Sequence, residues 1–77
     1  MQPGIYQHYK GNLYHVIGVG RHSESLEEIV IYRGFYADYG LWVRPKTLFE
    51  SMVEHQGNTI PRFKFVKLLD YEAPVLR

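Results

Sequence analysis

Histidine is the residue of this sequence best suited to metal binding or acid–base chemistry, because its imidazole titrates near neutral pH and coordinates transition metals. No histidine stands four residues from another with a further ligand nearby, and the chain has no cysteine. The segment His22-Ser23-Glu24 offers two ligands at most. We therefore expect no metal site, and we interpret the histidines as hydrogen-bonding or solvated groups: His8, His15, His22 and His55.

A glycine-rich segment and three serines are the remaining candidates for cofactor binding or catalysis. Gly18-Val19-Gly20-Arg21 has the first two glycines of a dinucleotide-binding fingerprint, but Ser23 takes the place of the third, and a βαβ unit does not fit in so short a chain. No serine has a histidine and an aspartate at a spacing that singles out a nucleophile. The sequence therefore predicts no cofactor and no catalytic residue. A small hydrolase that uses His22 stays an open alternative.

Aromatic and basic side chains form the more informative group, since 16% of the residues are aromatic. Side chains alternate along a strand, so Trp42 and Arg44 are expected to share one face, as are Tyr14 and His22. If these faces coincide, they form a shallow groove that suits a peptide, an anionic group or an unstacked base. The alternative is that the aromatic rings are core. Two more sets are expected to share a face: Tyr6 with His8 and Lys10, and Tyr32 with Tyr36.

Short strands must position these side chains, because β-branched and aromatic residues dominate the segments between turns. The spacing of Leu48, Phe49 and Met52 after Pro45 predicts one or two helical turns over residues 46–52. Gln56-Gly57-Asn58 is a predicted turn. Five strands are predicted, over residues 5–9, 13–22, 29–36, 41–44 and 62–66.

Short strands separated by turns predict an all-β fold. We expect a small, partly open antiparallel barrel of SH3-like type with one helical turn. Gly18 and Gly20 within a strand indicate a bend or bulge, which a small barrel needs at a corner. An α+β fold with a longer helix over residues 45–54 is the alternative. At 77 residues the chain supports one core, so we expect one domain over residues 1–70 and a loosely held tail over 71–77.

Charge and hydropathy limit the partners. The net charge of +1 lacks the strong basic excess typical of nucleic-acid-binding proteins. The longest clean apolar run, Ile29-Val30-Ile31, is far shorter than a membrane span, and the N-terminus has no signal-peptide pattern. Together with the absence of cysteine, these features predict a cytoplasmic protein that contacts no membrane.

Four short motifs occur in order along the chain: HYKG at residues 8–11, RHSE at 21–24, VIYR at 30–33 and WVRP at 42–45. With Gly4-Ile5-Tyr6-Gln7 before the first, they resemble a family of short bacterial proteins catalogued only as a domain of unknown function. The resemblance runs from about residue 3 to about residue 66 and implies no reaction. Gly20 departs from it, since alanine is more usual there. Seven residues fall on its motif positions and form our candidate ligand-binding set: His8, Lys10, His22, Glu24, Tyr32, Trp42 and Arg44.

The leading hypothesis is a non-enzymatic binding module that holds a ligand or protein partner in this aromatic and basic groove. A structural homodimer whose aromatic face is the interface is the alternative. Binding of single-stranded nucleic acid is a weaker alternative, because the charge is nearly balanced. Glu24 is expected either to contact the ligand or to form an ion pair with Arg44 or Lys10.

Overall fold

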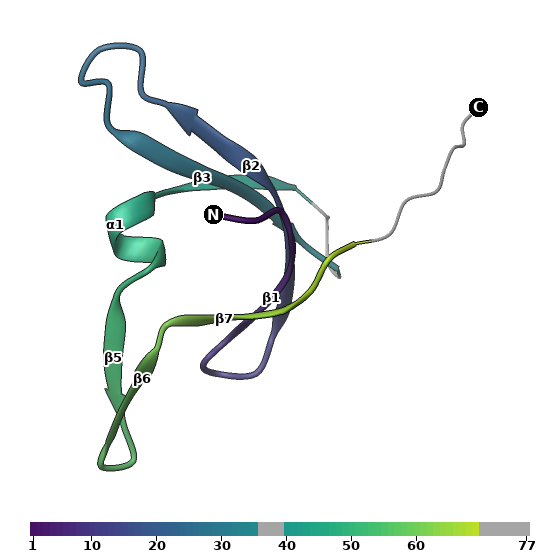
Figure 1. The fold of residues 1–77 in the computed structure, drawn as a ribbon, viewed down its shortest axis with the longest axis vertical. Coiled ribbons are helices and arrows are strands. Elements are labelled where there is room, and N and C mark those ends of the chain that lie inside the picture. The colour runs from purple at the N-terminus through teal and green to yellow at the C-terminus, as the bar shows by residue number, and fades with distance from the viewer. Residues whose placement is uncertain (36–39, 70–77) are drawn as a thin grey trace.

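The computed structural model describes residues 1–35 and 40–69 and contains seven strands and one short helix (Figure 1). Tyr36 and the predicted tail over residues 71–77 lie outside the described residues. The elements are β1 (Gly4–His8), β2 (Leu13–Arg21), β3 (Glu28–Gly34), β4 (Leu41–Pro45), α1 (Lys46–Phe49), β5 (Met52–His55), β6 (Asn58–Pro61) and β7 (Phe63–Lys67).

Five of the strands form one antiparallel sheet in the order β4-β3-β2-β1-β7, and β5 pairs with β6 in a separate hairpin. The sheet curves strongly, so its inner face turns toward α1 (Figure 1). Within the described residues the two edge strands, β4 and β7, do not pair with each other, and the barrel is therefore not closed. The predicted all-β, partly open antiparallel fold is confirmed, and the α+β alternative is wrong.

A bulge in β2 changes which side chains face the core. The register with β3 shifts between Val16 and Gly18, so Val16 lies opposite Tyr32 while Val19 lies opposite Val30. Residues directly opposite each other share a face, and an extra residue reverses the alternation that follows it. Gly18 therefore marks a bulge as predicted, but the expectation that alternation continues unbroken along β2 is wrong.

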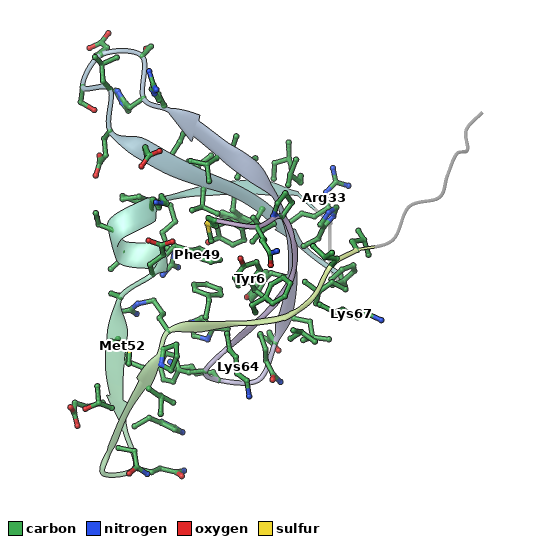
Figure 2. The ribbon with its side chains drawn as sticks, viewed as in Figure 1. Tyr6, Arg33, Phe49, Met52, Lys64 and Lys67 are labelled. Carbon is green, nitrogen blue, oxygen red and sulfur yellow. The ribbon has the colours of Figure 1, made fainter. Side chains whose placement is uncertain are left out.

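The core is small and mostly aromatic. Phe49 is 1% exposed, and its ring stacks on Phe63 with 3.9 Å between centroids and 4° between planes. Tyr6 and Tyr32 meet Phe49 edge-on at 5.5 Å each. Figure 2 shows Tyr6 and Phe49 pointing into the space that the curved sheet encloses. Six buried side chains form this core: Tyr6, Val16, Val30, Tyr32, Phe49 and Phe63.

The helix is shorter than predicted, since it ends at Phe49 and Met52 begins β5. Gln56 and Gly57 both have positive φ, 53° and 84°, which makes the two-residue connection between β5 and β6 a tight hairpin turn. The turn predicted at Gln56-Gly57-Asn58 is thus present, but the strands beside it were not predicted. No helix in the described part of the chain is long and apolar enough to cross a bilayer.

Candidate functional site

The inner face of the sheet carries the candidate site where β4 approaches β7. Trp42 lies opposite Tyr32 and Arg44 lies opposite Val30 in the β3–β4 register, so Trp42 and Arg44 occupy the inner face together. This confirms that the two side chains share a face. We name the group around Arg44 the Arg44 face and define it by six residues: His8, Tyr14, Tyr32, Trp42, Arg44 and Phe63.

Arg44 is held by aromatic groups. Its guanidinium carbon lies 5.5 Å from the centroid of the Phe63 ring, and its Nε donates a hydrogen bond to the Tyr32 hydroxyl at 3.3 Å. The side chain is half-buried, and the ion pairs of the described residues place no carboxylate on it. A planar cation fixed over a ring retains further N–H donors for an incoming carboxylate or phosphate.

Trp42 leaves most of its surface in solvent, with 57% of it exposed. It stands two residues from Arg44 on the same face and at the free edge of the sheet. An exposed indole beside a cation offers apolar area with a donor N–H, a combination enriched at binding surfaces. The arrangement therefore favours a partner that presents both a planar apolar group and an anion.

His8 adds a second donor to the Arg44 face. The Nδ1 atom accepts a hydrogen bond from the backbone N–H of Lys10 at 3.1 Å, so the neutral ring carries its proton on Nε2. The centroid of the His8 ring lies 4.9 Å from that of Phe63 and 6.5 Å from that of Tyr14. Burial lowers the pKa of His8 below its ordinary 6.5, and the charges of Arg44, Lys10 and Arg62 lower it further. The His8 ring is therefore neutral at pH 7 and lies in a positive local field.

Three of the predicted site residues lie elsewhere. Lys10 is exposed in the turn after β1, with its Nζ 5.8 Å from the Tyr9 ring. His22 and Glu24 lie in the β2–β3 loop, where Nδ1 of His22 accepts hydrogen bonds from the N–H groups of Glu24 at 3.2 Å and Ser25 at 3.4 Å. These hydrogen bonds shape the loop, and the structure does not bring His22 or Glu24 to the Arg44 face.

The separation of His22 from Tyr14 has two causes. The bulge reverses the alternation between them, and β2 ends at Arg21, one residue short of the prediction. Within the described residues, Glu24 pairs with neither Arg44 nor Lys10, while Lys46 pairs with Glu28 at 3.6 Å and with Glu50 at 3.7 Å. Of the seven candidates, the structure gathers four: His8, Tyr32, Trp42 and Arg44.

The candidate set omits two members of the Arg44 face, Tyr14 and Phe63, and Phe63 has the more contacts of the two. The Phe63 ring is the contact that most members of this face share. Its neighbours are Arg44, His8, Tyr14, Tyr32 and Phe49. The sequence predicted a strand over residues 62–66 but gave no sign of which face Phe63 occupies or which cation covers it. Arg62, its neighbour, donates from Nε to the Ser51 hydroxyl at 2.9 Å.

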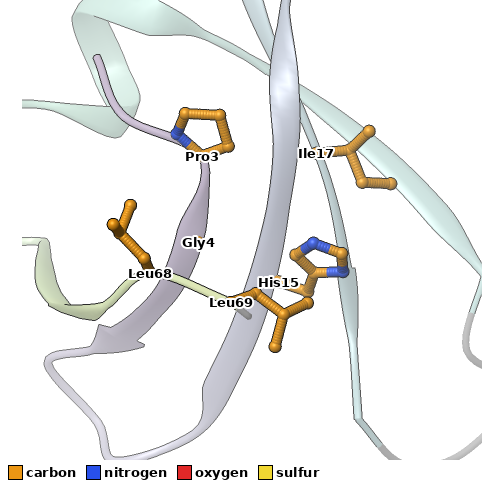
Figure 3. Close-up of a pocket in the computed structure, with 6 residues that line it drawn as sticks. All are labelled: Pro3, Gly4, His15, Ile17, Leu68 and Leu69. Atoms are coloured by element: carbon orange, nitrogen blue, oxygen red, sulfur yellow. The ribbon is translucent and has the colours of Figure 1, made fainter. Parts of the chain in front are cut away.

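Two shallow hollows differ from the Arg44 face, although the second shares His8 with it. One, of about 380 Å³, is lined by Pro3, Gly4, His15, Ile17, Leu68 and Leu69 (Figure 3). The other, of about 360 Å³, lies between the end of β1, β6 and β7 and includes His8 in its wall. The described residues contain no cluster of three or more His, Asp or Glu side chains that could hold a metal ion.

The fold and this face define a class: a small all-β domain built on one curved, open antiparallel sheet, with an arginine held over aromatic rings. The family model described as a protein of unknown function, DUF1653, matches residues 4–65, and the chain belongs to that family. The resemblance stated from the sequence motifs is thereby confirmed.

A solved relative has the same fold. The crystal structure of a DUF1653 protein from Bordetella bronchiseptica matches with a TM-score of 0.81 and 32% sequence identity. The match covers 94% of this chain and 95% of that one. No curated protein matches the sequence.

Proposed function

We propose that this domain is a non-enzymatic binding module, and that the Arg44 face holds a partner bearing an oxyanion, a carboxylate or a phosphate, next to a planar apolar group. One observation carries the proposal. The Arg44 guanidinium rests on Phe63 and on the Tyr32 hydroxyl, without an acidic partner in the described part of the chain, beside the exposed ring of Trp42.

Electrostatics support an anionic partner. Burial weakens the solvation of the guanidinium, and an approaching oxyanion replaces water with charge-assisted hydrogen bonds. Arg44, Lys10 and Arg62 all lower the pKa of His8, which means that three cations act on one region of the face. The neutral His8 ring then supplies an Nε2–H donor rather than a fourth charge.

The surroundings of His8 favour binding over catalysis. General acid–base work needs a histidine near a nucleophile or an orienting carboxylate. The described neighbours of the His8 ring are instead the aromatic rings of Tyr9, Tyr14 and Phe63 and the charges of cations. Rings and cations of this kind position a ligand by shape and charge.

Fluorescence of Trp42, the single tryptophan of the chain, tests the proposal directly. Phenyl phosphate combines a ring with an anion, whereas phenol has only the ring and inorganic phosphate has only the anion. We expect phenyl phosphate to change the emission saturably with a dissociation constant on the order of millimolar, as befits so small a ligand. Phenol and phosphate should each bind at least about tenfold more weakly, because each loses one of the two contacts.

Arginine variants separate this site from general charge effects. Arg44→Met keeps the apolar stem and removes the charge, so we expect about a tenfold or larger loss of phenyl phosphate affinity. Arg21→Met is the matched control, because Arg21 is exposed at the end of β2. Equal losses in the two variants, or no saturable signal from the unmodified protein, would overturn the proposal.

A further inference from the structure

The two edge strands of the sheet differ in how they are protected from pairing with another chain. Strand β7 carries Lys64 and Lys67, both exposed, and Figure 2 shows these side chains pointing away from the core. Lysines on an edge strand discourage addition of a further strand. Strand β4 is the opposite edge and has three uncharged apolar residues in a row, Leu41-Trp42-Val43, followed by Arg44 and Pro45, so its protection is confined to one end.

Both faces of β4 are open. Leu41 and Val43 point to the outer face of the sheet and are 59% and 61% exposed, while Trp42 points to the inner face. A ligand on the inner face covers Trp42 but leaves the two outer side chains in water. A strand added alongside β4 covers side chains on both faces and pairs the free backbone N–H and C=O groups of the edge.

We infer that the β4 edge pairs antiparallel with the β4 edge of a second copy of this chain. The two-fold register centred on Val43 places each Val43 opposite the other and each Trp42 opposite Arg44 of the second copy. That register brings an arginine next to an exposed indole twice, which is an attractive cation–π arrangement. Leu41 then lies opposite Pro45, so the outer face of the pair is apolar throughout.

The expected dimer is weak. One pair of five-residue strands buries less surface than a standard stable interface, so we expect a dissociation constant on the order of 100 μM. The interface would extend the sheet from five strands to ten. The pairing shares Trp42 and Arg44 with the proposed ligand site, but Leu41 and Val43 lie on the outer face and belong to the dimer alone.

Sedimentation equilibrium over a range from about ten times below to ten times above that constant tests the association. The unmodified protein should change from a 9.1 kDa monomer toward twice that mass as its concentration rises. Val43→Lys puts two like charges opposite each other and should weaken association at least about tenfold. Leu41→Lys is a second variant of the same strand, and it keeps the test decisive if Val43→Lys fails to fold.

Val66→Lys is the matched control, because Val66 is 46% exposed on β7, the other edge. We expect this variant to dimerise like the unmodified protein and the Val43→Lys monomer to bind phenyl phosphate normally. A protein that stays monomeric across the range would overturn the inference, as would a dimer that survives both β4 variants. An unmodified protein that binds phenyl phosphate but stays monomeric would overturn the dimer alone, and a protein that dimerises without binding phenyl phosphate would overturn the ligand site alone.

Disulfide trapping tests the register, since the chain has no cysteine of its own. Residues directly opposite in antiparallel strands are about 4.5–5.5 Å apart at Cα, within reach of a disulfide. Val43→Cys should therefore form a covalent dimer under mild oxidation. In the same register two Leu41→Cys residues are about 14 Å apart and should not cross-link. Equal cross-linking at both positions would contradict the register.

Discussion

Gly4 and Gly20 both lie in strands of the main sheet, but their environments differ. Gly4 has a φ of 142°, and a β-carbon there would come within 2.6 Å of the backbone oxygen of Lys67. Gly20 has no such constraint, since a β-carbon would meet Ile31 Cδ1 at 3.4 Å, an ordinary contact distance. The strand β1 requires its glycine at the point where β7 approaches, whereas β2 does not require Gly20.

The contrast predicts opposite effects of the same substitution. Gly20→Ala should raise the free energy of unfolding by about 0.5–1 kcal/mol, because alanine restricts the unfolded chain. Gly4→Ala should lower the free energy of unfolding by more than about 1 kcal/mol, since both the backbone conformation and the space exclude a side chain. Urea unfolding of the two variants measures both. A destabilised Gly20→Ala variant would contradict this account of the bulge region.

His8 makes stability depend on pH. Burial, followed by the charges of Arg44, Lys10 and Arg62, lowers its pKa in the folded protein below the ordinary 6.5. Burial and Arg33 lower the pKa of His15 in the same direction. The unfolded chain therefore binds more protons below pH 6.5, and the free energy of unfolding decreases as the pH falls below that value. Above it the neutral rings make no such contribution.

A variant isolates the part that belongs to His8. His8→Asn retains an oxygen that can accept the Lys10 N–H but does not titrate. The urea midpoint of the unmodified protein should be lower at pH 5.5 than at pH 7.5, and the difference should be smaller in His8→Asn. The difference in urea midpoint that remains in His8→Asn is expected to come from His15. An unchanged difference in the variant would show that His8 does not govern the acid sensitivity.

Among the elements, the β5–β6 hairpin depends on two backbone conformations. Gln56 and Gly57 both have positive φ, as the two central residues of a type I′ turn must. Asparagine adopts this conformation more readily than glutamine, so Gln56→Asn should stabilise the domain by a few tenths of a kcal/mol. Gly57→Ala should destabilise it by about 1 kcal/mol. Urea unfolding of both variants checks the signs, and the same sign for both would contradict the turn type.

Local sequence pattern predicted the strands of the main sheet well, because each is a short β-rich run between turn residues. Strand β3 is the clearest case, with 29–36 predicted and Glu28–Gly34 described. The β5–β6 hairpin escaped prediction because Met52 continues the apolar stripe of Leu48 and Phe49. Helical and extended readings of Met52 fit equally well without knowledge of its partner strand. Pairing of Met52 with Pro61 decides the matter, and pairing is a long-range property.

The candidate site was predictable in part for the same reason. Alternation within one short strand correctly placed Trp42 and Arg44 on a common face. Alternation failed over the longer β2, where the position of the bulge is set by pairing with β3 rather than by Gly18 alone. The expected face shared by His22 and Tyr14 is therefore wrong, and His22 lies in the β2–β3 loop. Which cation rests on Phe63 depends on the curvature of the whole sheet, which no local pattern contains.

At the scale of the whole molecule, stability depends on one stacked aromatic pair in the core. The contact between Phe49 of α1 and Phe63 of β7 holds α1 against the main sheet. Phe49→Ala should lower the free energy of unfolding by about 3–5 kcal/mol, much of the total for a domain of this size. Leu48→Ala, next to it and 42% exposed, should lower it by less than about 1 kcal/mol. Thermal unfolding of the pair measures the contrast, and similar losses would show that the core lies elsewhere.

At the same scale, the proposed function requires that ligand contacts fall on one side of the molecule. Two-dimensional NMR during a phenyl phosphate titration measures this most directly. The account predicts that the Trp42 indole N–H, the Arg44 Nε–H and the His8 ring signals shift together with one dissociation constant, while His22 and Glu24 do not shift. Shifts confined to the outer hollow around His15 and Ile17, or scattered over the whole surface, would contradict it.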